Sequence, residues 1–91
     1  MYCTYVPLSK KDGKFYVGYT NNLQARLESR NKGRVDSTSY RRPFVLIYCE
    51  ACINQKDAIR REKYFKTYLG KMFLKNRLKS YLTGSMPRSR D

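Results

Sequence analysis

The chain has 91 residues, with 20 lysines and arginines, 7 aspartates and glutamates and no histidine, so its formal net charge is +13 at pH 7. This length allows one small domain with one hydrophobic core, and the excess of positive charge indicates an anionic partner, of which nucleic acid is the commonest. No apolar run reaches the roughly 18 residues of a membrane-spanning helix and no segment has the layout of a signal peptide, so we expect a cytoplasmic protein that does not insert into a membrane.

The N-terminal third of the chain has the pattern of a β-hairpin followed by a helix. Residues 2–9 and 14–19 are rich in aromatic and β-branched side chains, and the Asp-Gly pair at 12–13 is typical of a turn. Pro7 cannot donate a hydrogen bond to a neighbouring strand, so we expect it at an edge, a bulge or a strand end. Asn21, with Gln24 three residues later, predicts the start of a helix over 22–31, and Gly33 ends it.

The rest of the chain has the pattern of a polar loop, a strand and two helices. Residues 34–43 form a basic loop, and the apolar run that follows has the length of a buried strand. A helix begins near Asn54, where apolar residues recur at helical intervals, and Gly70 breaks or kinks it. The expected apolar faces consist of Ala58, Ile59, Phe65, Leu69 and Met72 on this helix, and of Phe73, Leu74, Leu78, Tyr81 and Leu82 on the last one. We expect one α+β domain over residues 1–83 and a flexible basic tail over 84–91.

Side chains able to bind metals or to transfer protons are scarce. Cys3, Cys49 and Cys52 are too few for a structural zinc site in a chain without histidine, so we expect buried or unreactive thiols. The carboxylates are dispersed, which argues against a nuclease with two metal ions. One carboxylate can still hold Mg²⁺ together with water and substrate phosphate. Glu62 is the acid most surrounded by basic residues, and its alternative role is an ion pair with Lys66 one helical turn away.

Two arginines and two tyrosines are candidates for contact with a phosphate. Arg26 and Arg30 lie one turn apart on the predicted helix, where like charges repel each other mildly. They form either a solvated helix face or a phosphate site, because a bound phosphate would reverse the sign of that interaction. Tyr5 and Tyr16 fall on adjacent predicted strands, where both hydroxyls can face one side. Each serves either in packing or as a base or water-positioning group, and nearby cations must then lower a phenol pKa of about 10.

The order and spacing of these residues resemble the GIY-YIG nuclease domain, in particular the small stand-alone bacterial proteins of excision-repair-nuclease type. The resemblance extends from about Tyr2 to Leu82 and includes TYV at 4–6, YVG at 16–18, GYTNNLQARL, STSYRRPFVLIYCE and AIRREKYFK. It implies a small antiparallel three-stranded β-sheet flanked by helices. It also implies metal-dependent hydrolysis of a DNA phosphodiester bond by a nucleophile derived from water, in DNA repair or processing.

The resemblance further implies roles for individual residues. Tyr5 is the expected base or water-positioning residue, and Tyr16 supports it. Gly18 allows close backbone approach, Arg26 contacts the phosphate, and Glu62 holds one Mg²⁺ or Mn²⁺ ion. Arg30 and Asn76 are expected to support the site, and the basic residues expected to contact nucleic acid are Arg41, Arg42, Arg60, Arg61, Lys63 and Lys66.

Three positions depart from the family pattern. Thr4 replaces the usual small or apolar residue of the first signature, Pro7 interrupts its strand, and Arg30 stands where His or Tyr is frequent. The cation at position 30 either tightens phosphate binding or leaves the site inactive. We therefore weigh three functions: a DNA endonuclease, with or without a protein partner for targeting; a nucleic-acid-binding module of weak or no activity on the same fold; and a basic RNA-associated protein, which would not need the ordered set of site residues.

Overall fold

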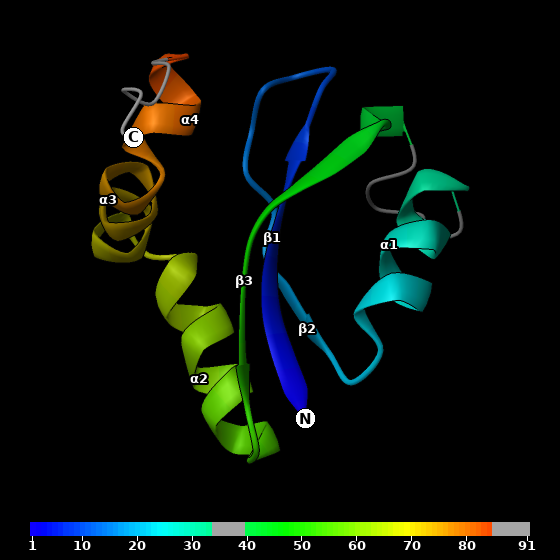
Figure 1. The fold of residues 1–91 in the computed structure, drawn as a ribbon, viewed down its shortest axis with the longest axis vertical. Coiled ribbons are helices and arrows are strands. Elements are labelled where there is room, and N and C mark those ends of the chain that lie inside the picture. Colours follow the sequence, from blue (N-terminus) through cyan, green and yellow to red (C-terminus); the bar gives the residue numbers. More distant parts are fainter. Residues whose placement is uncertain (34–39, 85–91) are drawn as a thin grey trace, which may run out of the picture.

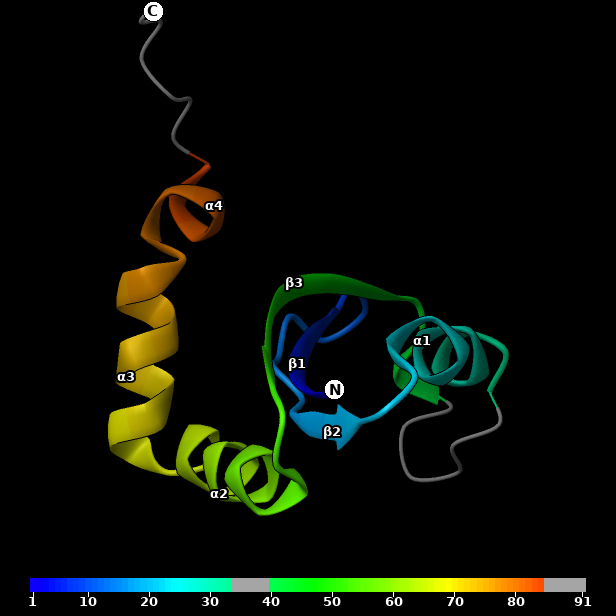
Figure 2. The ribbon, with the colours of Figure 1, turned by 60° about the horizontal axis from the view of Figure 1, so that its bottom comes forward.

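The computed structural model describes residues 1–33 and 40–84. Within them the structure has three strands and four helices, which are β1 (Tyr2–Ser9), β2 (Gly18–Thr20), α1 (Leu23–Asn31), β3 (Phe44–Cys52), α2 (Gln55–Phe65), α3 (Tyr68–Arg77) and α4 (Lys79–Thr83). The strands form one antiparallel sheet in the order β2-β1-β3. α1 lies on one side of the strands, and α2, α3 and α4 lie on the other (Figure 1, Figure 2). The expected α+β fold with a three-stranded antiparallel sheet is confirmed.

The pairing of the neighbouring strands with the central strand β1 changes at Pro7. The register between β1 and β3 shifts immediately before Pro7, so the proline lies at a bulge, one of the three places expected for it. On the other edge, β2 pairs with β1 over Gly18–Thr20, and an isolated bridge joins Leu8 to Phe15. The second strand is therefore shorter than the expected 14–19. Pro7 accepts a hydrogen bond from Tyr16 N–H (2.9 Å) but has no N–H to donate in return.

The first helix begins one residue later than expected. Asn22 caps α1, because its side-chain oxygen accepts a hydrogen bond from Ala25 N–H (3.2 Å). The predicted pairing of Asn21 with Gln24 as a capping box is therefore wrong. Gly33 follows the end of α1 with a φ of +77°, a conformation that favours glycine, so the predicted stop is confirmed.

The expected long helix from Asn54 is divided into α2 and α3 at Thr67. The hydroxyl of Thr67 accepts from Gly70 N–H (3.1 Å) and donates to the carbonyl of Tyr64 (2.6 Å), so this residue caps α3. Gly70 does not break a helix. It lies in the first turn of α3, where a Cβ would collide with the Tyr64 carbonyl oxygen. The expected last helix is divided at Leu78, so this part of the described chain holds three helices in place of the two predicted.

The core lies where β1, α2 and α3 meet. Leu69 and Met72, expected on the buried helix face, are 67% and 48% exposed, so that part of the prediction is wrong. The chain changes direction between α2 and α3 (Figure 2), which puts the apolar residues of α3 out of phase with those of α2. The buried cluster consists of Val6, Phe65 and Leu74, with Phe15, Val17, Ile47, Tyr48 and Tyr64 packed against it.

The three cysteines are free. Cys49 is exposed, and Cys3 and Cys52 are half-buried, so none is a buried thiol. Within residues 1–33 and 40–84, no helix is both long and apolar enough to cross a membrane. The predicted tail beyond Gly84 and most of the predicted loop, residues 34–39, lie outside the described residues.

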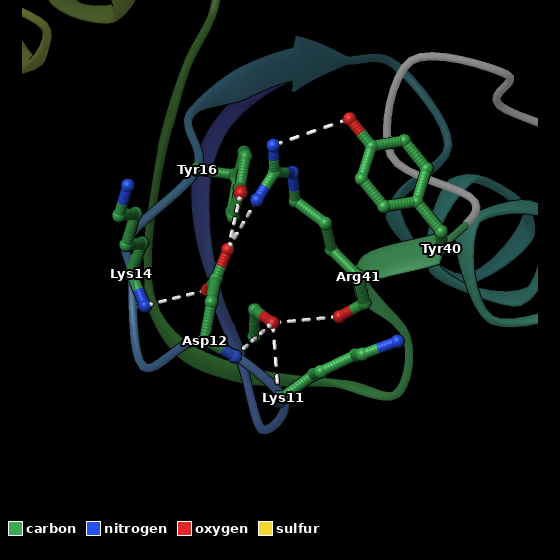
Figure 3. Close-up of polar contacts among 7 residues, drawn as sticks. Lys11, Asp12, Lys14, Tyr16, Tyr40 and Arg41 are labelled. Atoms are coloured by element: carbon green, nitrogen blue, oxygen red, sulfur yellow. Dashed lines mark hydrogen bonds and ion pairs between the residues drawn. The ribbon is translucent and has the colours of Figure 1, made fainter.

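A polar cluster joins the turn after β1 to the segment that leads into β3 (Figure 3). Asp12 accepts hydrogen bonds from the hydroxyl of Tyr16 (2.8 Å), the guanidinium of Arg41 (2.9 Å) and the backbone N–H of Lys14 (2.9 Å). The hydroxyl of Ser9 donates to the carbonyl of Arg41 (2.6 Å). The cluster therefore fixes two segments that lie 29 residues apart in the sequence.

The hydrogen bonds of this cluster shift the pKa values of its members. Burial alone would raise the pKa of Asp12, but hydrogen bonds from Lys14 N–H, Tyr16 and Arg41 hold it well below its usual range. Burial, followed by the hydrogen bond to Asp12, raises the pKa of Tyr16 above its usual value. Near neutral pH the carboxylate is therefore charged and the phenol is protonated, which is the state in which all these bonds form.

We expect the contribution of Asp12 to stability to depend on pH. Because the pKa of Asp12 is lower in the folded chain than the roughly 3.9 of an unfolded chain, its charged form stabilises the fold above about pH 4. This stabilisation is lost as the pH falls toward the folded-state value. Urea unfolding should therefore show wild type more stable than Asp12→Asn above about pH 5, with a gap that narrows below about pH 4.

The matched control is Asp57→Asn, since Asp57 pairs with Arg60 in an ion pair whose side chains are 55% and 74% exposed. That variant should stay within about 0.5 kcal/mol of wild type at neutral pH. A gap for Asp12→Asn of the same size at pH 3 and at pH 7 would contradict the account of this cluster.

Candidate active site

A groove of about 430 Å³ lies along residues 15–19, between α1 on one flank and α2 and α3 on the other. Its walls thus come from segments that are far apart in the sequence. The polar and charged side chains that line it are Tyr16, Tyr19, Arg26, Arg30, Glu62, Lys66 and Lys71. Gly18 also lines the groove, so most of the residues expected to form the site come together here.

Tyr5 does not line this groove, although it is essential to the geometry of the groove. Its side chain is fully buried, and its hydroxyl oxygen accepts hydrogen bonds from Nε of Arg26 and Nε of Arg30, each at 3.2 Å. A Cβ at Gly18 would lie 2.7 Å from that oxygen, so glycine is needed where β2 passes over the phenol. Such burial does not fit the expected contact of Tyr5 with water. The geometry instead has Tyr5 hold two guanidinium groups in place.

Arg26 is the exposed member of this arginine pair. Its Nε–H is engaged by Tyr5, which leaves the two terminal nitrogens of the guanidinium as donors. Within residues 1–33 and 40–84, no carboxylate forms an ion pair with Arg26. The side chain can therefore bind a phosphate without first losing an acidic partner from this part of the chain.

Arg30 is buried, with 6% of its surface exposed. Its guanidinium carbon lies 5.7 Å from the centre of the Tyr5 ring and 5.9 Å from the centre of the Phe44 ring, within the range of cation–π attraction. A solvated helix face, one of the two interpretations of the pair, is therefore wrong for Arg30. A permanent cation packed between rings also means that position 30 offers no proton acceptor to the groove.

Glu62 reaches the groove from α2, on the flank opposite Arg26. Its side chain is 18% exposed and accepts a hydrogen bond from Lys66 Nζ at 3.2 Å, so the ion pair considered from the sequence does form. Within the described ranges, no group of three or more His, Cys, Asp or Glu side chains could hold a metal. Glu62 therefore fits a divalent cation only in the mode that uses one protein carboxylate, with water and substrate oxygens as the other ligands.

Tyr16 lines the groove, and its hydroxyl donates to Asp12 (2.8 Å). The ring packs edge-on against Phe44, with centres 5.4 Å apart. The hydroxyls of Tyr5 and Tyr16 thus have different partners, since Tyr5 accepts from Arg26 and Arg30 whereas Tyr16 donates to Asp12. The raised pKa of Tyr16 agrees with its role as a hydrogen-bond donor to Asp12.

Most of the other residues expected to bind nucleic acid have structural partners. Arg61 forms two hydrogen bonds with Glu50 (2.7 and 3.2 Å) and lies 4.6 Å from the centre of the Phe65 ring. Arg41 is engaged by Asp12, and Arg60 forms an exposed pair with Asp57. Lys66, which pairs with Glu62, lines the groove, and Arg42 and Lys63 are exposed outside it. Asn76, expected to support the site, is exposed on α3 and does not line the groove.

Two features of the site were missed from the sequence. The Asp-Gly pair predicts only a turn at Asp12, and no local signal reveals its bonds to Tyr16 and Arg41. Lys71 was missed although Lys75 follows it one helical turn later, the same like-charge spacing that singled out the arginine pair. That signal could have identified Lys71.

Comparison with known proteins identifies the family. The model of the GIY-YIG catalytic domain matches residues 1–76. UPF0213 protein SH2523 of Staphylococcus haemolyticus is 41% identical over 66 residues, which cover 71% of this chain and 80% of that protein. A UPF0213 protein of Bacillus pumilus is 43% identical over 61 residues, or 66% of this chain, and the match spans less than two thirds (62%) of that relative.

One solved structure also matches. The solution NMR structure of the UPF0213 protein BH0048 from Bacillus halodurans shares 30% identity, with a TM-score of 0.49, over 81% of this chain and 82% of that one. The match of the family model over most of the chain is the stronger finding. The chain therefore belongs to the GIY-YIG catalytic domain family, a family of nuclease domains.

Proposed function

We propose that this chain is a metal-dependent endonuclease that hydrolyses phosphodiester bonds in DNA, acting in the cytoplasm in DNA repair or processing. The observation that carries the proposal is a single groove lined by both Arg26 and Glu62, with Arg26 held by the hydroxyl of Tyr5. Membership of a nuclease family supports the reaction class. The net charge of +13 supports an anionic polymer as substrate, and a protein partner would supply any further targeting.

Arg26 would bind the phosphate of the bond to be cut. Its Nε is held by Tyr5, so the terminal N–H groups are oriented before the substrate arrives. Negative charge on the phosphate oxygens grows during hydrolysis, and donors that are already oriented stabilise that charge most effectively. Arg30 adds a second fixed positive charge close to the same hydroxyl.

Glu62 would hold one Mg²⁺ or Mn²⁺ ion at the opposite flank. When bound, such an ion polarises the phosphate and makes a water molecule nucleophilic at neutral pH. In this step the protein itself would hold one carboxylate, that of Glu62, at the groove wall. Tyr5 would be a positioning residue for Arg26, and Tyr16 would keep the turn and the groove wall in place through Asp12.

Removal of the Glu62 carboxylate should abolish cleavage while DNA binding is retained. The measurement is Mg²⁺- or Mn²⁺-dependent cleavage of labelled branched, nicked and linear DNA by wild type, Glu62→Ala and Arg26→Ala. We expect no metal-dependent product from Glu62→Ala and a loss of about 10²- to 10³-fold for Arg26→Ala, the usual effect of removing one donor to a developing negative charge. The control is Glu28→Ala, which removes an exposed carboxylate of α1 that does not line the groove.

Cleavage by Glu62→Ala at the wild-type rate would refute the role of Glu62. If wild type cleaves none of the substrates either, and wild type and Glu62→Ala bind DNA with the same dependence on salt, the chain is a nucleic-acid-binding module on a nuclease fold.

Removal of the Tyr5 hydroxyl should slow cleavage without removing a base. In Tyr5→Phe the Nε groups of Arg26 and Arg30 lose their shared acceptor. We expect kcat to fall about 10- to 100-fold through loss of orientation, with DNA binding in EDTA nearly unchanged. Tyr2→Phe, a half-buried tyrosine of the same strand, is the control. A rate–pH profile of unchanged shape supports positioning, whereas loss of its rising limb in Tyr5→Phe would identify Tyr5 as the base.

A further inference from the structure

The groove continues into a second pocket of about 400 Å³, which we call the lysine pocket. It is lined by Gly13, Lys14 and Phe15 after β1 and by Lys71 and Lys75 of α3. Phe15 and Lys71 line both the groove and the lysine pocket, so the two are continuous. None of the residues expected from the sequence to contact nucleic acid lines the lysine pocket.

The core determines where the lysines of α3 lie. Leu74 is fully buried against Val6 and Phe65, which fixes α3 against the central strand. Lys71 and Lys75, three residues before and one residue after Leu74, are exposed and line the pocket. The position of this positive charge is therefore set by core packing and does not depend on a flexible tail.

The charges of the lysine pocket are not neutralised within the described ranges. No carboxylate in residues 1–33 and 40–84 forms an ion pair with Lys14, Lys71 or Lys75. Lys71 and Lys75 are one helical turn apart, a spacing at which like charges repel. A phosphate bound between them would turn this repulsion into attraction.

Phe15 makes a single strand a better fit than a duplex. The side chain is half-buried, packs against the core and also lines the pocket. A groove of cations with an aromatic ring is the combination that binds single-stranded nucleic acid, in which the backbone meets the cations and a base stacks on the ring. In a duplex the bases are stacked in the interior, so an aromatic ring in a pocket cannot reach the face of a base.

We propose that the lysine pocket binds a single-stranded segment of nucleic acid, next to the substrate phosphodiester bond that would be cut between Arg26 and Glu62. Lys14, Lys71 and Lys75 contact successive phosphates, and Phe15 contacts a base or sugar. The proposal rests on the proposed function in one respect, that the adjoining groove is where cleavage occurs. It defines the substrate class as a duplex that carries a single-stranded tail or branch.

The test is binding without metal, measured by fluorescence anisotropy in EDTA. The probes are a blunt DNA duplex, the same duplex with a single-stranded DNA tail, and the same duplex with an RNA tail. The main variant is Lys71→Glu/Lys75→Glu. Its control, Lys32→Glu/Lys56→Glu, changes the net charge equally at exposed lysines that line neither the groove nor the lysine pocket.

We expect wild type to prefer a tailed probe, and the main variant to lose at least about tenfold in affinity for it. The slope of log affinity against log salt should become shallower by about 1.4, because two contacts to single-strand phosphates each contribute about 0.7. For the blunt duplex, the affinities of both double variants should fall by the same factor. The DNA and RNA tails show which polymer the lysine pocket takes, and selective loss on either supports the proposal.

Phe15→Leu separates stacking from charge. Leucine keeps an apolar side chain against the core but removes the flat ring, so affinity for the tailed probe should fall at least about threefold and that for the blunt duplex should not change. A circular dichroism spectrum of each variant is the check that it is folded. The proposal is overturned if wild type has no preference for tails, or if the main variant loses no more than its control.

These outcomes are independent of catalysis. Tail-selective binding that depends on Lys71 and Lys75, in a protein that cleaves nothing, keeps the lysine pocket and refutes the endonuclease. Cleavage that depends on Glu62, in a protein without any preference for tailed DNA, keeps the endonuclease and refutes the lysine pocket as a binding site.

Discussion

The hydroxyl of Tyr5 is the contact on which the candidate site depends. It belongs to the central strand, is fully buried, and accepts hydrogen bonds from two guanidinium groups of α1. This arrangement fastens the helix to the sheet where Gly18 leaves room for the phenol. The cost of burying the Arg30 cation is offset in part by the rings of Tyr5 and Phe44. The exposed Arg26 is consequently held at its Nε by a buried hydroxyl of the central strand.

The distribution of charge follows a consistent pattern around this contact. Most carboxylates of the described residues pair with a basic side chain: Asp12 with Arg41, Glu50 with Arg61, Asp57 with Arg60 and Glu62 with Lys66. These pairs engage basic residues that composition alone would assign to nucleic acid. The cations that remain on the groove and the lysine pocket include Arg26, Lys71 and Lys75. Cations without an ion pair thus line the groove and the lysine pocket, and other exposed lysines, among them Lys32, Lys56 and Lys63, lie elsewhere on the described surface.

The sequence predicted the elements of the fold better than the contacts between them. Strands, the turn at Gly13 and the end of α1 depend on local patterns and on glycine, so they could be located to within a few residues. The division at Thr67 could not be foreseen, because the apolar spacing continues through it and the hydroxyl cap competes with helix continuation. The full burial of Tyr5 depends on the packing of three separate elements. The bond between Asp12 and Arg41 spans 29 residues, and no local pattern encodes it.

The two interpretations of Glu62 are compatible. The pair with Lys66 is a contact between residues one helical turn apart, and such pairs contribute about 0.2 to 0.5 kcal/mol. A divalent cation at the carboxylate exceeds that stabilisation easily, since it brings two charges and its own water ligands. Lys66 is 57% exposed and lines the groove, so on release it can turn toward a phosphate without leaving the site. The ion pair orients the carboxylate toward Lys66, and its presence does not argue against the proposed endonuclease.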